Sequence, residues 1–157
     1  MSKENAPPRD GLAEEVNQDV SQLIHHLRCS RAPDEALLVA QTHIRDALSA
    51  LKPWFEEGGG WYTISIGSDV PEFGWQEDAL TGVMPYSPIS GRRNPMAPPI
   101  KLWKAGENEV LGEAIFSPTY AGPPDSVHGG IIAGVFDEIL AMSNVISGAA
   151  GFTGTLT

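Results

Sequence analysis

The residues of this chain with the clearest chemical potential lie between Tyr120 and Glu138, where a loop rich in proline leads into an apolar, helix-like stretch. The predicted helix begins with Gly129 and Gly130, directly after His128. The N–H groups of a first helical turn have no partner within the helix and lie at the positive end of its dipole. Such donors suit a carbonyl oxygen that gains negative charge, which is the demand of acyl transfer.

Asp137 is the carboxylate that could act on such a carbonyl group. It follows Gly130 by two helical turns, so both residues share one face of the predicted helix, and Asn144 shares much of that face. Small residues on the same face leave space for a substrate in front of the carboxylate. Considered singly, however, each residue is more typical of a helix that packs tightly on a sheet, with Asp137 at an exposed edge.

Composition and charge narrow the class of protein. The 157 residues suffice for one domain with a helical extension, and 20 acidic against 10 basic residues give a formal net charge of -10. This balance argues against a nucleic-acid partner, which needs a clustered basic surface. No Lys or Arg follows Lys104, so an anionic ligand would need Arg92, Arg93 or Lys101, a partner chain, or residues beyond this sequence.

The sequence also predicts a compartment. Cys29 is the single cysteine, which excludes a disulfide within the chain and fits a reducing environment. The N-terminus has no apolar core of a secretory signal, and the apolar stretch 131–146 is interrupted by Asp137 and Glu138. We therefore expect a cytoplasmic protein with no membrane span. No spacing of His, Cys or carboxylates makes a convincing metal site.

Two amphipathic helices are expected ahead of the chemical segment. Apolar residues recur at helical spacing in two runs, and Asp34 is a plausible N-cap for the second helix. The first run comprises Leu12, Val16, Val20, Leu23 and Leu27, and the second comprises Leu37, Ala40, Ile44, Leu48 and Leu51. The two apolar stripes are expected to pack together as a helical hairpin, or to lie across a neighbouring subunit.

The chain divides by pattern into four parts. Residues 1–10 are expected to be a disordered lead-in, 11–57 the helical hairpin, 58–107 a Pro/Gly-rich connector with a short strand at 61–66, and 108–157 a folded segment. Within that last segment we expect a strand from Glu109 to Ser117, a long helix from Gly129 to Ser147 closed by glycine, and the start of another strand at 152–157.

The segment from Gly122 to Glu138, with the strings 91–95 and 97–99 upstream, resembles the hot-dog-fold acyl-CoA thioesterases. The resemblance covers about residues 84–157 and is strongest to the PaaI-like branch of the 4-hydroxybenzoyl-CoA thioesterase superfamily. Its most specific part is His-Gly-Gly followed by Asp, nine residues after His128. The resemblance implies an α+β fold in which a sheet wraps a long central helix, with Glu109–Ser117 as the first strand and active sites at a dimer interface.

The resemblance also implies roles for single residues. Gly129 would supply the backbone N–H that polarises a thioester carbonyl group, and His128 would shape the loop and contact the thioester. Asp137 would act as general base on water, or attack the carbonyl carbon directly; we favour the base. Gly130 and Asn144 would line the substrate site, and Arg92 and Arg93 would bind the CoA phosphates. No cofactor is implied beyond CoA as part of the substrate.

The resemblance further implies several strands after the central helix, of which residues 152–157 supply only a beginning. The chain is therefore expected to hold a partial hot-dog fold, C-terminally truncated or completed by another polypeptide, and to form a homo-oligomer, a dimer or a tetramer. Our leading hypothesis is an acyl-CoA thioesterase subunit. The alternatives are a catalytically silent remnant or interaction module that binds a partner through its helices, and a hydratase-type hot-dog protein.

Overall fold

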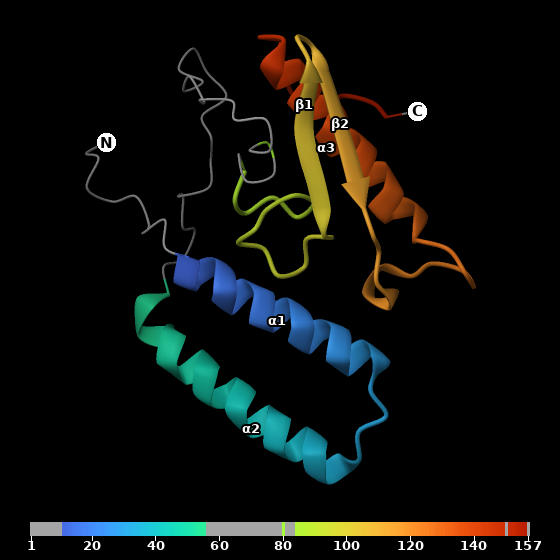
Figure 1. Ribbon diagram of the computed structural model, residues 1–157. Coiled ribbons are helices and arrows are strands. Elements are labelled where there is room, and N and C mark those ends of the chain that lie inside the picture. The colour runs from blue at the N-terminus through green and yellow to red at the C-terminus, as the bar shows by residue number, and fades with distance from the viewer. Residues whose placement is uncertain (1–10, 56–79, 81–83, 150, 157) are drawn as a thin grey trace.

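The computed structural model describes residues 11–55, 80, 84–149 and 151–156 (Figure 1). The elements, in chain order, are α1 (Gly11–Cys29), α2 (Asp34–Leu51), the 3-10 turn η2 (Lys52–Trp54), strands β1 (Ile100–Gly106) and β2 (Glu109–Ala114), the 3-10 turn η3 (Pro118–Tyr120) and α3 (Gly129–Ile146). The predicted lead-in, the strand at 61–66, the last two residues of the predicted hairpin (56–57) and residues 58–79 and 81–83 of the connector lie outside the described residues.

The described strands form a two-stranded antiparallel sheet. Leu102 is paired with Gly112 and Lys104 with Val110, and the register shifts between Lys104 and Gly106. Strand β1 corrects the expectation that the connector continues to residue 107 and that the first strand begins at Glu109. The prolines Pro98 and Pro99 argued against a strand here, because proline cannot donate a hydrogen bond within a sheet. Both prolines lie just before Ile100, the first paired residue of β1.

Helix α3 packs against β2, and a small core lies between them. The buried core residues are Leu80, Ile100, Leu102, Val110 and Met142. Gly112 permits the close approach of helix and sheet, because a Cβ atom there would lie 2.8 Å from Leu102 Cδ2 and 3.2 Å from Ile139 Cδ1. The side of β2 that carries Val110, Gly112 and Ala114 therefore faces α3, and the strand ends at Ala114 rather than at the expected Ser117.

The C-terminus of α3 ends as the sequence predicts, at a glycine. Gly148 has φ +74°, its N–H donates to Val145 O at 3.1 Å, and the Ala149 N–H donates to Asn144 O at 2.9 Å. These two bonds form a Schellman motif, which satisfies the last free carbonyl groups of the helix. The strand expected at 152–157 is not formed over residues 151–156, which are exposed coil. Alternating residues define the two sides of a strand but cannot supply the neighbouring ladder that it needs.

Helices α1 and α2 occupy the ranges that the apolar spacing predicts, and neither contains a fully buried residue. Helix α2 lies alongside α1, on the side away from the sheet (Figure 1), and α1 packs against η3. Pro33 is the N-cap of α2, so Asp34 is the first helical residue rather than the cap. The apolar stripes are only partly covered: Ile44 is half-buried, whereas Leu48 is 63% exposed.

Among the described residues, α3 is the one helix long and apolar enough to cross a membrane by length and composition. The central helix of a soluble fold passes the same test. Two carboxylates, Asp137 and Glu138, lie in the middle of α3, where each would cost about 3 kcal/mol in a bilayer. Only Glu138 and Met142 of α3 are fully buried, and Ile132, Phe136 and Leu140 remain exposed.

The Schellman motif predicts a specific loss of stability on substitution. Replacing Gly148 with Ala places a Cβ atom at φ +74°, although no other atom lies within 4 Å of that position. We expect Gly148→Ala to lower the free energy of unfolding by about 1 kcal/mol through backbone strain alone. Urea unfolding followed by circular dichroism measures it. Gly154→Ala, in open exposed coil, is the matched control and should leave the free energy unchanged; equal effects of the two substitutions would exclude this explanation.

Candidate functional site

The loop before α3 is a tight hairpin rather than an open coil. Ala121 and Val127 form an antiparallel bridge, and the Gly122 N–H donates to Ser126 O at 2.9 Å. At the tip, the Ser126 N–H donates to Pro123 O at 3.1 Å, and Asp125 has φ +58°. Proline followed by a residue of positive φ fits a type II turn, so the Pro-Pro-Asp string fixes the shape of the tip.

Gly122 lets this hairpin return to the start of the helix. A Cβ atom at Gly122 would lie 2.8 Å from His128 Cα and 3.0 Å from His128 N, which no side chain tolerates. The His128 N–H in turn donates to Tyr120 O at 2.9 Å. The hairpin therefore fixes the position of His128 through backbone contacts. In the sequence, Gly122 before the two prolines is the one sign of this close approach.

His128 caps the helix that it precedes. Its Nδ1 atom accepts a hydrogen bond from the Gly130 N–H at 3.0 Å, as an N-cap side chain does. Nδ1 is therefore the unprotonated nitrogen of a neutral ring, and Nε2 carries the hydrogen. His128 thus links the end of the loop to the first turn of α3, and its imidazole is exposed.

Among the described residues, the Gly129 N–H has no hydrogen-bond partner. Gly129 is the first residue of α3, it is exposed, and no atom lies within 4 Å of the place where its Cβ would be. The described residues supply no acceptor for its N–H, whereas the next amide is taken by His128. This geometry can accommodate one external oxygen atom at the positive end of the helix dipole.

Asp137 lies half-buried two turns along α3 from Gly130, in the predicted register. Its Oδ1 atom accepts a hydrogen bond of 2.6 Å from the Thr153 hydroxyl group, in the segment after the helix. Sequence reasoning missed Thr153, since the contact depends on the path of the chain beyond Gly148. The Asn144 side chain is exposed, and its backbone oxygen accepts from Ala149. The helix therefore aligns Gly130, Asp137 and Asn144 as expected.

Glu138 was missed as well, although the fold buries it. The Ser87 hydroxyl donates to Glu138 Oε1 at 2.9 Å, and the Ser90 hydroxyl donates to the same oxygen. The Ser87 hydroxyl oxygen also accepts the Ile89 and Ser90 N–H groups, so the turn folds around one serine. The sequence feature that could have predicted its burial is the spacing to Met142. Glu138 comes four residues before this apolar residue, so both lie on the core side of the helix.

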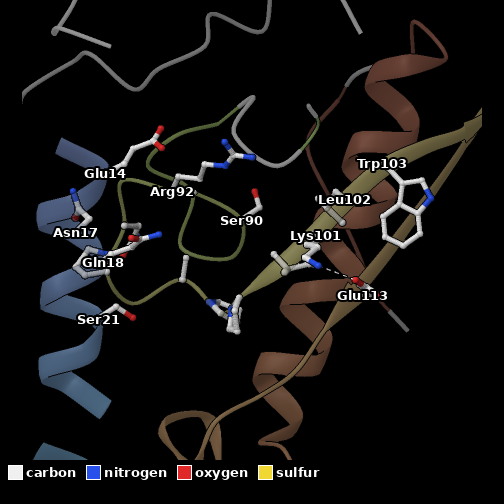
Figure 2. Close-up of a pocket in the computed structure, with 17 residues that line it drawn as sticks. Glu14, Asn17, Gln18, Ser21, Ser90, Arg92, Lys101, Leu102, Trp103 and Glu113 are labelled. Carbon is white, nitrogen blue, oxygen red and sulfur yellow. Dashed lines mark hydrogen bonds and ion pairs between the residues drawn. The ribbon is translucent and has the colours of Figure 1, made fainter. Parts of the chain in front are cut away.

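Arg92 and Arg93 lie in the loop that Glu138 holds, and their positions differ. Arg92 is exposed and lines a groove of about 940 Å³ between α1, this loop and β1 (Figure 2). Arg93 is half-buried, and its backbone N–H donates to Pro85 O at 2.7 Å. On the same groove, Lys101 Nζ lies 3.2 Å from the Glu113 carboxylate.

The groove and the start of α3 are separate surfaces within one chain. The groove lining includes Arg92 but none of the residues on α3 or before it that the sequence assigned to the site, namely His128, Gly129, Gly130, Asp137 and Asn144. Within one chain, Arg92 therefore lines a different surface from these five residues. In the described part of the chain, no group of three or more His, Cys, Asp or Glu side chains could hold a metal ion.

Tyr120 connects the two surfaces. Its buried hydroxyl group donates to Ala97 O at 2.8 Å, and its ring packs edge-on against Phe116 with ring centroids 6.0 Å apart. Burial raises the pKa of the Tyr120 phenol above its ordinary value of 10.0. The residue therefore ties the groove loop to the hairpin that positions His128.

The raised pKa of Tyr120 predicts a loss of stability in alkali. As pH rises, the Tyr120 phenol of the unfolded chain loses its proton before that of the folded chain does. The contribution of Tyr120 to the free energy of unfolding is therefore complete below pH 10 and declines as pH rises through the folded-state pKa. Tyr120→Phe should remove this part of the alkaline decline and cost about 1 kcal/mol at pH 7 by leaving Ala97 O unpaired. Urea unfolding between pH 7 and 11 measures both effects; an identical pH slope in the two proteins would contradict the assignment.

Comparison with known proteins bears on the fold. Comparisons with family models and with curated protein sequences both give no match. Among solved structures, the chain is similar to the crystal structure of a thioesterase superfamily protein, with a TM-score of 0.69 and 24% identity over 96% of this chain and 72% of that chain. The chain therefore has a fold like that of a thioesterase superfamily protein, which supports the hot-dog prediction, and its mixture of helices with a small antiparallel sheet agrees with the α+β class.

Proposed function

We propose that this chain is a thioester hydrolase that cleaves an acyl-CoA into a free acid and CoA. The observation that carries the proposal is the free Gly129 N–H at the start of α3, together with the half-buried Asp137 two turns along the same helix. The likeness in fold to a thioesterase superfamily protein supports it. Because folds host many activities, the argument for the activity depends on these residues.

The proposed reaction needs one donor and one base. The thioester oxygen accepts the Gly129 N–H, which stabilises the negative charge that develops when water attacks the carbonyl carbon. Asp137 removes a proton from that water, and the tetrahedral intermediate then collapses with cleavage of the carbon–sulfur bond. The departing CoA sulfur takes up the proton from Asp137, so the carboxylate is regenerated and atoms balance.

Neighbouring groups support these two roles. The Thr153 hydroxyl bonds one carboxylate oxygen, Oδ1, which leaves the other oxygen of Asp137 for the water molecule. The His128 ring accepts a hydrogen bond from the Gly130 N–H, so the Gly129 N–H is the donor proposed for the oxyanion. In this proposal the Nε2–H group of His128 lies beside the thioester. Gly130 and Asn144 extend the same helix face and would line the acyl site.

The CoA phosphates require basic groups that this face of one chain lacks, since no Lys or Arg follows Lys104. We propose a cytoplasmic homodimer of the PaaI-like type, in which Arg92 and Arg93 of a second copy reach the CoA bound at the start of α3. Exposed apolar residues on α3 give that copy a surface to cover: Ile132, Phe136 and Leu140 are 41%, 58% and 53% exposed.

An interaction module without catalytic activity is the second candidate function. The exposed apolar residues of α1 and α2 favour it, because such helices can bind a partner whether or not the start of α3 is active. Hydrolysis that depends on Gly129 and Asp137 separates the two candidates. If the protein hydrolyses thioesters, the first candidate function stands. If the protein is folded but does not hydrolyse thioesters, the second candidate function is favoured.

Gly129→Pro tests the oxyanion donor with little change to the fold. Proline is favoured at the first position of a helix, where its missing N–H had no helical partner, and the preceding His128 has the extended ψ of 130° that proline requires. We expect Gly129→Pro to lower kcat/KM about 100- to 1,000-fold with several acyl-CoA substrates, measured by thiol release.

Gly129→Ala is the matched control, because it keeps the N–H and its Cβ meets no atom within 4 Å. This variant should retain most of the activity and unfold at the same urea concentration as the proline variant. If both variants lose activity equally, the open space at Gly129 matters and the N–H does not.

Asp137→Asn tests the general base. The amide cannot accept the proton of the attacking water, so we expect kcat to fall about 100- to 10,000-fold with little change in the far-ultraviolet circular dichroism. Asp46→Asn makes the same chemical change on an exposed position of α2 and should have no effect. Retained hydrolysis in Asp137→Asn would eliminate the proposed mechanism.

A further inference from the structure

The side chain of Ile89 lies on helix α3 at Gly134. A Cβ atom added at Gly134 would be 2.7 Å from Ile89 Cδ1 and 3.4 Å from Ile89 Cγ1, so the end of this half-buried side chain covers the glycine. Ile89 is not part of the hydrophobic core. The half-buried apolar residues that pack against the core in the described part of the chain are Met84, Ala114, Val135, Ile139 and Ile146. Core packing therefore does not account for the contact between Ile89 and α3.

The turn that carries Ile89 is fixed to α3 one helical turn beyond Gly134. The Ser87 hydroxyl group donates to Glu138 Oε1 at 2.9 Å, and the Ser90 hydroxyl group donates to the same oxygen. The Ile89 N–H donates to Ser87 Oγ at 3.1 Å. Because Glu138 follows Gly134 by four residues, the polar and the apolar contacts of this turn are neighbours on the helix surface. The backbone of Ile89 is thus held in place before any substrate binds.

Gly134 lies on α3 between residues that we propose for the substrate site. It follows Gly130 by about 6 Å and precedes Asp137 by about 4.5 Å along the helix axis, at a rise of about 1.5 Å per residue. Around the axis, Gly134 is about 40° from Gly130 and about 60° from Asp137. It is about 140° from Ile139, which packs against the core. Ile89 therefore borders the face of α3 that carries Asp137.

The helix face before Gly134 has room for a small group. Among the described residues, a Cβ atom at Gly130 would meet only His128 Nδ1 and Cε1 within 4 Å, at 3.2 Å and 3.3 Å, and one at Gly129 would meet no atom. In the proposed reaction, the thioester oxygen lies at the Gly129 N–H and the acyl group extends along this face towards the catalytic carboxylate. The acyl carbon atoms next to the carbonyl group then lie near Gly134, within reach of Ile89.

We propose that Ile89 determines the acyl specificity of this site, by contact with the carbon atom that follows the thioester carbonyl group. Its Cδ1 methyl group admits an unbranched acyl chain and overlaps a methyl branch at that carbon atom. Movement of the turn does not relieve the overlap, because Ser87 and Ser90 hold the turn on the buried Glu138. This inference rests on the proposed thioesterase function and adds the substrate class, namely unbranched acyl-CoA esters.

Ile89→Val tests the contact by removing only Cδ1, the methyl group that lies over Gly134. We expect Ile89→Val to raise the ratio of kcat/KM for isobutyryl-CoA to that for butyryl-CoA about tenfold, because one methyl group in a shaped apolar pocket gives discrimination of this size. Thiol release measures both rates. Ile115→Val makes the same change at a residue that is 89% exposed and should leave the ratio unchanged. An unchanged ratio in Ile89→Val would overturn the inference.

The double variant Ile89→Val, Gly134→Ala restores the lost volume from the helix side. The new Cβ atom would lie 2.7 Å from the position of the removed Cδ1 and 3.4 Å from the remaining Cγ1, which is ordinary van der Waals contact. We expect the ratio of kcat/KM to return to the value of the unsubstituted protein, with both variants folded in urea unfolding experiments. A purely structural role of Ile89 would alter stability without this reversal, so a ratio that stays raised in the double variant contradicts the proposal.

Binding of S-alkyl thioethers of CoA, which cannot be hydrolysed, separates this inference from the proposed activity. S-butyl-CoA and S-isobutyl-CoA have the same two chain shapes, and calorimetry measures their dissociation constants. The unsubstituted protein should bind S-butyl-CoA about tenfold more tightly, and Ile89→Val should remove most of this difference. If this pattern holds without hydrolysis of either thioester, the role of Ile89 stands and the proposed activity is wrong. Hydrolysis with a ratio that Ile89→Val leaves unchanged overturns the role of Ile89 alone. A protein that neither binds nor hydrolyses these compounds overturns both.

Discussion

The buried carboxylate of Glu138 is the interaction on which the arrangement of this molecule depends. Among the described residues, it is the charged side chain that the fold buries, and the hydroxyl groups of Ser87 and Ser90 satisfy it. A buried carboxylate without such donors would be strongly unfavourable, so helix α3 and the turn at 87–90 are held as one unit. That turn leads through Pro98 and Pro99 into β1, and its position therefore sets how the sheet meets the helix.

The adjacent residue, Asp137, has the opposite environment because successive side chains of a helix point about 100° apart. One carboxylate faces the serine turn and is fixed; the other lies at the surface, where only Thr153 contacts it among the described residues. Glu138 thus has a structural role, whereas Asp137 is the carboxylate that we propose for catalysis. At the start of the same helix, a hairpin with Gly122 at its base fixes His128, which caps the Gly130 amide, while the Gly129 amide has no partner among the described residues.

Several surfaces of the described part of the chain remain apolar. Helix α3 and the two N-terminal helices each expose apolar residues, while Arg92 and Lys101 line a groove that contains no residue of α3. A single chain thus separates the carboxylate from the arginines that an anionic substrate would require. In the proposed dimer, contacts between copies would cover the apolar stripe of α3 and bring Arg92 of one copy towards Asp137 of the other.

The sequence by itself determined the elements whose pattern is local. The two amphipathic helices, the inward face of β2, the long helix from Gly129 and its glycine end follow from spacing and from single-residue preferences, as does the alignment of Gly130 with Asp137. Only the tertiary structure decided the contacts between distant segments: the strand after Pro99, the serines on Glu138, Thr153 on Asp137, and the separation of Arg92 from the helix. Periodicity shows which side of a helix or strand is apolar. It does not show which segment packs against that side, because such contacts join residues far apart in the sequence and depend on the path of the whole chain.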